Sequence, residues 1–231
     1  MTKPTLISYL REHLEAERSK KDPGPYLTIS RQYGCDGYEL GLVLVELLNE
    51  RDPQQRWRLW CKELLSQLAE DTRVDVDRLG RERLAKPGLI KDFLRGLKKS
   101  DVPDRVEILN YLRLMIRTLA FNGYCILIGR GGAAVSSDVA NGLSLRIEAP
   151  KEWRIARLCQ RESISRQAAA EKLERIEKER ARLRAYYAQQ NPREPAFNLV
   201  FDNSVFPKAS LAALVIKAME EKKMIEKLAG K

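Results

Sequence analysis

Short apolar segments alternate with amphipathic helical segments along this chain, and this alternation limits its fold more than any other feature. Segments 26–30 and 124–128 are too short for helices and read as buried strands, each followed by a glycine-bearing turn. The remaining strands are expected at 57–60, 143–147 and 198–201. Helices are expected at 38–49, 62–70, 104–121, 153–158, 166–189 and 208–228. The pattern predicts an α/β fold with a parallel sheet of about five strands and helices on both faces.

The chain has 231 residues, which is enough for one domain with its own buried core. Residues 26–231 are expected to form that domain, after an N-terminal amphipathic helix and linker at 1–25. Residues 71–103 are charged and interrupted by prolines, so their pattern does not indicate a particular succession of helices and strands. No apolar run approaches the about 18 residues of a membrane span. The oligomeric state stays open.

Cysteine and histidine usage excludes several classes of site. The four cysteines are 26, 64 and 34 residues apart and form no C-x-x-C pair, which indicates reduced thiols in a cytoplasmic protein. The only histidine is His13. This composition argues against histidine-based metal sites and against a Ser-His-Asp triad.

Positive charge is concentrated in one stretch. The chain has 42 basic and 32 acidic residues, and half of this surplus of ten lies in 151–186, with eleven basic and six acidic residues. A basic surplus alone suits nucleic acid, a membrane surface or a phosphorylated small molecule. Aromatic residues are 7%, and no nucleic-acid motif occurs, so binding of nucleic acid is the least favoured of the functions considered.

Arginines in this basic stretch recur at helical spacing. Arg154 and Arg157 share one helix face, and the long helix carries Arg175, Arg180 and Arg184 at intervals of five and four. Two interpretations stay open. The arginines could be solvated and paired with nearby glutamates. They could instead form a lid that closes over polyphosphate, because forked guanidinium groups position and neutralise phosphates.

The turn at 34–37 lies between a strand and a helix, where ligands of parallel sheets bind. Backbone N–H groups and the helix N-terminus make such a turn an anion site. The full phosphate-loop pattern is absent, because no lysine follows Gly37 and Glu39 stands where a hydroxyl residue is expected. Asp36 and Glu39 also have the spacing of a helix cap, and both acids repel phosphate unless Mg²⁺ is present.

Several ordered motifs together resemble the cytidylate-kinase-like family, a branch of the nucleoside monophosphate kinases. The resemblance covers roughly residues 26 to 220. The motifs that carry it are Thr28 to Leu40 (TISRQYGCDGYEL), Ile128 to Gly132 (IGRGG), Ala149 to Arg154 (APKEWR) and Ile176 to Tyr187 (IEKERARLRAYY).

The resemblance implies a three-layer P-loop kinase-like fold, with an arginine-rich lid at about 160–195 and an acceptor-side helical insertion at 71–103. It implies ATP as donor, Mg²⁺, and CMP or a related pyrimidine monophosphate as acceptor, so the partners are nucleoside mono- and triphosphates. The catalytic candidates are Arg130, Arg175 and Arg180. The donor-binding candidates are Arg31, Gln32, Tyr33, Gly34, Cys35, Asp36, Gly37, Tyr38, Glu39, Arg154 and Arg157, with Glu39 also a candidate for the metal.

The chain departs from the family pattern at several positions. Asp36 stands where relatives commonly have a small residue or proline, Cys61 and Glu177 replace common aspartates, and Phe197-Asn198-Leu199 replaces a common Tyr-Asp-Leu. These departures and the missing lysine keep a second function open, that of a nucleotide-binding or sensing module without catalysis.

Overall fold

The computed structural model describes residues 22–61, 105–190, 192 and 196–227. Three expectations lie outside these residues: the helix within 1–25 except for the end of its linker, the helix at 62–70, and the acceptor-side insertion at 71–103.

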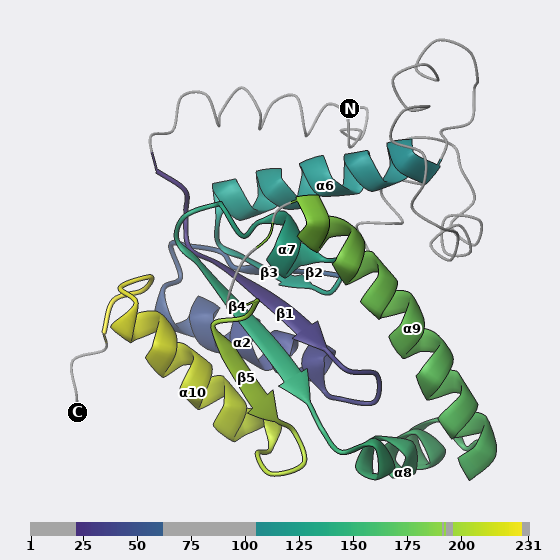
Figure 1. Ribbon diagram of the computed structural model, residues 1–231. Coiled ribbons are helices and arrows are strands. Elements are labelled where there is room, and N and C mark those ends of the chain that lie inside the picture. Colours follow the sequence, from purple (N-terminus) through teal and green to yellow (C-terminus); the bar gives the residue numbers. More distant parts are fainter. Residues whose placement is uncertain (1–21, 62–104, 191, 193–195, 228–231) are drawn as a thin grey trace, which may run out of the picture.

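A single five-stranded sheet forms the centre of the described chain (Figure 1). Its order is β2-β3-β1-β4-β5, and every neighbouring pair is parallel. The strands are β1 (Tyr26–Arg31), β2 (Arg58–Trp60), β3 (Cys125–Ile128), β4 (Gly142–Glu148) and β5 (Leu199–Asp202). The predicted parallel α/β architecture is confirmed, with all five strands near their expected positions.

Helices cover both faces of this sheet. One face packs on α2 (Gly37–Arg51) and α10 (Lys208–Glu221), and the other on α6 (Arg105–Asn122), the short α7 (Gly132–Val135) and part of α9 (Arg166–Gln190). The helix α8 (Lys151–Glu162) packs on the first half of α9, at the carboxyl end of the sheet (Figure 1). No helix in the described ranges is both long and apolar enough to cross a membrane.

The two faces of the sheet differ in polarity. Leu27 and Ile29 of β1 join the apolar core toward α2 and α10, whereas Thr28 points to the opposite face, because side chains alternate along a strand. On that opposite face Arg146 of β4 donates to Ser30 Oγ at 3.0 Å. The strand predicted at 26–30 is therefore apolar on the face toward α2 and α10, and its other face becomes polar toward the carboxyl ends of the strands.

The start of α9 has a clear sequence signal, whereas α7 has none. Ser165 caps the long helix, since the Ala168 N–H donates to Ser165 Oγ at 3.2 Å. The helix α7 was not expected from the sequence, because four residues are too few to produce a helical pattern.

We expect the substitution Thr118→Val to raise the free energy of unfolding by about 1 kcal/mol. Thr118 is fully buried in α6, and its hydroxyl has no hydrogen-bond partner among the residues that the structure describes. Removing an unpaired buried hydroxyl while keeping the side-chain shape recovers its desolvation cost. Thermal unfolding should show a melting temperature about 2–4 °C higher, and a lower melting temperature would contradict this reading of the hydroxyl.

Candidate functional site

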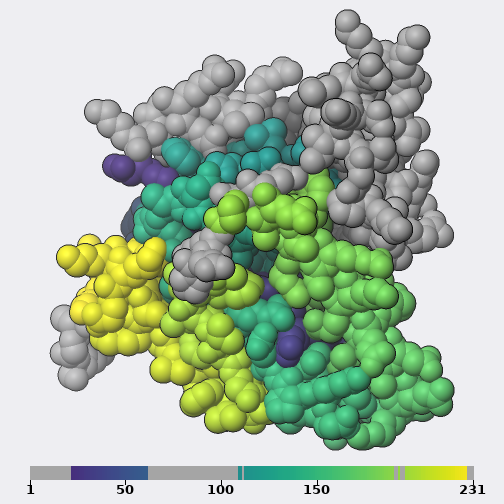
Figure 2. All heavy atoms as spheres, in the orientation of Figure 1, coloured from purple at the N-terminus to yellow at the C-terminus, as the bar shows by residue number. Residues whose placement is uncertain are grey.

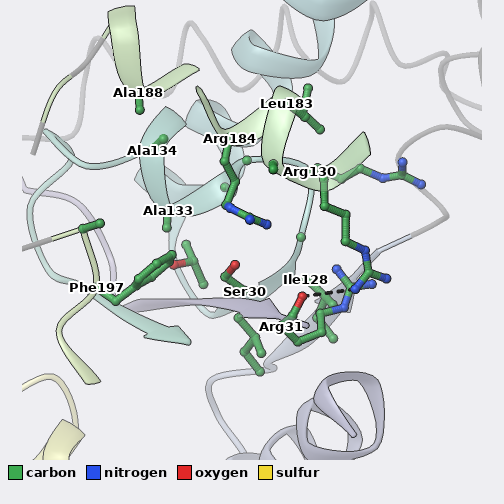
Figure 3. A pocket seen from close by; sticks show the side chains of 18 of the residues that line it. Ser30, Arg31, Ile128, Arg130, Ala133, Ala134, Leu183, Arg184, Ala188 and Phe197 are labelled. Atoms are coloured by element: carbon green, nitrogen blue, oxygen red, sulfur yellow. Dashed lines mark hydrogen bonds between the residues drawn. The ribbon is translucent and has the colours of Figure 1, made fainter. Parts of the chain in front are cut away.

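A cavity of about 780 Å³ opens at the carboxyl ends of β1 and β3. Its walls are the end of β1, the turn between β3 and α7, one face of α9, and residues 196 and 197 (Figure 3). In Figure 2 the surface is hollowed beside the green atoms of α9, and purple atoms from the start of the described chain are visible inside. The position agrees with the general rule for parallel sheets, whose ligands bind at this edge.

The turn after β3 has an uncommon backbone. Gly129, Arg130 and Gly131 all have positive φ, at 72°, 57° and 74°. A Cβ at Gly129 would lie 2.1 Å from Nη1 of Arg31, and one at Gly131 would lie 2.4 Å from Cδ2 of Tyr187. Only glycine allows the turn to pack this closely on both sides. Arg130 holds a left-handed backbone between them, a strained conformation for a residue with a side chain.

The loop from Arg31 to Asp36 is tied to the ends of β4 and β5. The Gln32 N–H donates to the Ile147 carbonyl at 2.9 Å, and Gln32 Oε1 accepts from the Ala149 N–H at 2.9 Å. The Asp36 N–H donates to Asn203 Oδ1 at 2.8 Å, which holds the end of the loop against the turn after β5.

A carboxylate of the protein itself contacts this loop. Glu177 of α9 accepts a hydrogen bond from the Tyr33 N–H, and its Oε1 lies 3.7 Å from Arg154 Nη1. Arg154 is buried and donates to the carbonyls of Ala149 and Tyr33, at 2.9 and 3.2 Å. Glu177 is therefore held between a loop N–H and a buried arginine, a pair of donors that would also suit a phosphate oxygen.

Asp36 forms a second ion pair at the loop and does not cap α2. Its Oδ1 lies 2.5 Å from Arg157 Nη2, and it makes no capping hydrogen bond. Among the described residues, the N–H groups of Gly37, Tyr38 and Glu39 have no acceptor. The capping alternative is therefore wrong, since the tertiary partner Arg157 takes the carboxylate. The first turn of α2 keeps the free donors and the positive dipole end that bind anions.

The cavity wall is rich in arginine. Arg31, Arg130, Arg180 and Arg184 line it, and Arg180 Nη1 donates to the Arg31 carbonyl at 3.1 Å (dashed in Figure 3). Arg180 also lies over the Tyr33 ring, 5.3 Å from its centroid. Burial lowers the pKa of both Arg180 and Arg184, because a guanidinium loses hydration in this cavity.

Two of these arginines stay without a partner. In the described part of the chain, Arg130 and Arg184 make no hydrogen bond and no ion pair. The described cavity lining also contains no aspartate or glutamate. Since buried charges are normally paired, the cavity presents positive charge that an anion would neutralise.

The structure brings together only part of the predicted set. Arg31, Tyr38, Arg130 and Arg180 line one cavity. Other predicted residues lie in the loop or pack against it: Gln32, Tyr33, Gly34, Cys35, Asp36, Gly37, Arg154 and Arg157. Arg175 does not line the cavity, because it projects to solvent and pairs with Glu179.

Burial raises the pKa of Cys35 to about 12, so its thiol stays neutral.

The sequence analysis did not include three residues of the site. Arg184 belonged to the recognised arginine series but was not included among the site candidates, although it lies one helical turn after Arg180. Glu177 was noted only as a departure from a family pattern, and its contact with Tyr33 depends on how α9 packs. Asn203 contacts the loop from a distant turn, and no local pattern points to it.

The residues present fit a magnesium ion only in part. No cluster of three or more His, Cys, Asp or Glu side chains within the described residues could hold a metal by itself. Glu39 remains as one carboxylate in the first turn of α2. This is compatible with Mg²⁺, which proteins often bind through one or two carboxylates together with substrate phosphates and water.

The chain is similar to known proteins in sequence pattern and in fold. A family model described as the cytidylate kinase-like family matches residues 26–205. The chain belongs to this family. The match covers the loop, the turn after β3 and all of α9, which are the elements of the site described above. No protein in a search of curated sequences matches the chain.

Solved structures are similar to this family member at low sequence identity. An uncharacterized protein from Eubacterium ventriosum has a TM-score of 0.61 and 19% identity, over 85% of this chain and 98% of that one. A shikimate kinase from Bacteroides thetaiotaomicron has a TM-score of 0.48 and 13% identity, over 87% of this chain and 99% of that one. The first similarity shows that the fold is shared.

Proposed function

We propose that the protein transfers a phosphoryl group from ATP to a nucleoside monophosphate, CMP or a related pyrimidine nucleotide. The observation that carries this proposal is the juxtaposition of two anion-binding features. The free N–H groups at the start of α2 adjoin a cavity in which Arg130 and Arg184 have no partner in the described chain. Membership of a kinase-like family supports the same reaction class.

The donor phosphates would bind at the first turn of α2. There Gly37, Tyr38 and Glu39 offer N–H donors, and the helix dipole adds positive charge. Arg31 is a cation beside this turn, because its side chain packs along Gly37 and its guanidinium reaches Gly129. It would supply the positive charge that the missing lysine supplies in the full phosphate-loop pattern.

The acceptor phosphate would bind in the cavity, between Arg130 and Arg180. Phosphoryl transfer depends mainly on positioning and on neutralising charge at the transferred group, and these two arginines provide both. Mg²⁺, held by Glu39 and the donor phosphates, would neutralise further negative charge. Arg175 lies outside this set, while α9 and the last residues of α8 would form the lid expected at about 160–195.

One observation favours a second candidate, a nucleotide-binding module without catalysis. Glu177 and Asp36 form ion pairs with Arg154 and Arg157, two of the three arginines expected to bind the donor phosphates. A kinase that binds the donor phosphates through Arg154 and Arg157 has to break these two ion pairs in each catalytic cycle. A protein that only senses nucleotide has no such cycle.

Nucleotide binding and turnover separate these candidates. Thermal unfolding with ATP, Mg²⁺ and a panel of CMP, dCMP and UMP tests binding, because a ligand at 100 times its dissociation constant adds about 2.7 kcal/mol to the stability. ADP release with each monophosphate tests turnover. Turnover with at least one monophosphate is expected. Binding without turnover would favour the sensing module, and absence of both would contradict both candidates.

We expect Glu177→Gln to bind Mg²⁺-ATP at least about tenfold more tightly. The amide keeps the acceptor for the Tyr33 N–H but removes a negative charge from the phosphate site. Two like charges at 4 Å repel by about 4 kcal/mol at an effective dielectric of 20, so even a screened fraction gives this change. Isothermal titration calorimetry measures it. Glu174→Gln, an exposed change on the same helix, is the control, and equal or weaker binding by Glu177→Gln would contradict a competing carboxylate.

A further inference from the structure

The turn after β3 has a strained backbone at Arg130, and such a conformation persists only where its surroundings hold it. Toward the sheet, the Gly129 N–H donates to the Ile29 carbonyl of β1 at 2.9 Å. Toward α9, Gly131 packs against the ring of Tyr187, so closely that a Cβ would lie 2.4 Å from Cδ2 of the ring. The ring of Tyr187 therefore supports the turn from the side of α9.

Tyr187 is itself fixed by contacts away from the cavity. It is 2% exposed, and its hydroxyl donates to the Leu109 carbonyl of α6 at 3.0 Å. The ring of Tyr186 packs edge-on against its ring, with the two ring centroids 5.2 Å apart. Tyr187 is not among the described residues that line the cavity. It therefore contacts the turn that carries Arg130, but it would not contact a ligand in the cavity.

The same tyrosine determines where the cavity arginines of α9 lie. Arg180 and Arg184 precede Tyr187 by seven and three residues, so all three lie on nearly one side of the helix. Figure 3 shows Arg184 projecting from this side into the open space. The rigid ring contacts the turn of Arg130 and belongs to the helix of Arg180. It therefore sets the separation of the two arginines between which the acceptor phosphate would bind.

We propose that Tyr187 is a positioning residue of the acceptor site. Its ring keeps the turn of Arg130 in the left-handed conformation and at a fixed separation from Arg180, so that both guanidinium groups meet one phosphate. The inference rests on the proposed function and adds a residue that contacts neither substrate. The donor site does not depend on this contact, because α2 packs on the opposite face of the sheet, in a core cluster that, among the described residues, does not include Tyr187.

The test separates acceptor from donor. Tyr187→Leu removes the ring and should lower kcat/KM for the acceptor by about 100-fold, because a displacement of about 1 Å can cost this much. The dissociation constant for Mg²⁺-ATP, measured without acceptor, should change by less than about twofold, since distant and independent sites do not couple. Tyr187→Phe should retain most of the acceptor kcat/KM, because the ring and not the hydroxyl contacts Gly131.

A variant that destabilises the same core elsewhere is the control. Leu119 of α6 is 3% exposed in this core, and its carbonyl accepts from the Gly123 N–H, at the end of β3 opposite to the turn. Leu119→Ala should lower the melting temperature and leave kcat/KM for the acceptor unchanged. If Tyr187→Leu does not fold, Gly131→Ala breaks the same contact from the turn and should give the same difference between acceptor and donor.

Three results would overturn the inference and leave the kinase function in place. They are an unchanged acceptor kcat/KM in Tyr187→Leu, an equal weakening of donor and acceptor binding, and the same loss of acceptor kcat/KM in Leu119→Ala. If the unmodified protein neither binds nor phosphorylates any monophosphate, the proposed function and the inference are both overturned. Melting curves establish that each variant compared is folded at the assay temperature.

Discussion

Replacing Arg130 by methionine should lower turnover by at least about 100-fold and leave the protein folded. Arg130 lines the cavity, has no partner in the described chain, and follows the strand at whose end the acceptor phosphate would bind. Removing one preorganised group that stabilises transition-state charge typically costs about 10²–10³ in rate. Methionine keeps an unbranched side chain at the same left-handed position, so no new backbone strain is introduced.

The measurement is the rate of ADP release with saturating ATP and the best acceptor. The melting temperature should change by no more than about 2 °C, because Arg130 makes no hydrogen bond or ion pair within the described residues. Arg182→Met, on the exposed side of α9, serves as a control for the loss of one positive charge. If Arg130→Met retained more than about a tenth of the activity, Arg130 would not bind the transferring group.

Replacing Arg154 by methionine should have the largest effect on stability, about 3–5 kcal/mol. Arg154 is 6% exposed and links α8 to the loop through the carbonyls of Ala149 and Tyr33 and through Glu177. Its loss leaves a partly buried carboxylate without its cation and two carbonyls without these donors. Removing one partner of a buried ion pair costs far more than the pair contributes, because the other charge stays desolvated.

Urea unfolding measures this loss of stability, and a double variant isolates its cause. Arg154→Met combined with Glu177→Gln should regain at least about a third of the lost free energy, since the orphaned charge is then absent. A loss that is the same in the single and the double variant would assign it to the two carbonyls instead. A single variant as stable as the unmodified protein would contradict the ion-pair argument.

Much of the fold could be predicted because the signals are local. The apolar segments before the two glycine turns form neighbouring parallel strands, and Ser165 caps α9 as its position indicates. Segment 26–30 was expected to be a buried strand, yet its Thr28 lines the cavity. Threonine is found both in apolar cores and in ligand cavities. The sequence therefore could not show whether this face of the strand is covered by a helix or faces a ligand.

The candidate site was less predictable because the rotation of one helix decides its composition. α9 carries basic residues at many positions, but only Arg180 and Arg184 line the cavity. The rotation is set by Tyr187, which is buried against Gly131 and donates to the Leu109 carbonyl at 3.0 Å. Such a contact between distant segments is not encoded in the spacing of the arginines. The same limit applies to Asp36. Its position in the sequence suggests a helix cap, but in the fold its carboxylate pairs with Arg157 of α8.

The continuity of α9 has a consequence for how the two substrates would influence each other. Glu177 at the loop and Arg184 in the cavity are seven residues apart, so they lie two turns apart on nearly the same side of one helix. A donor phosphate that displaces Glu177 would shift the segment that carries Arg184. We therefore expect a free energy of coupling between donor and acceptor binding. By thermodynamic linkage each substrate then changes the affinity for the other by the same factor.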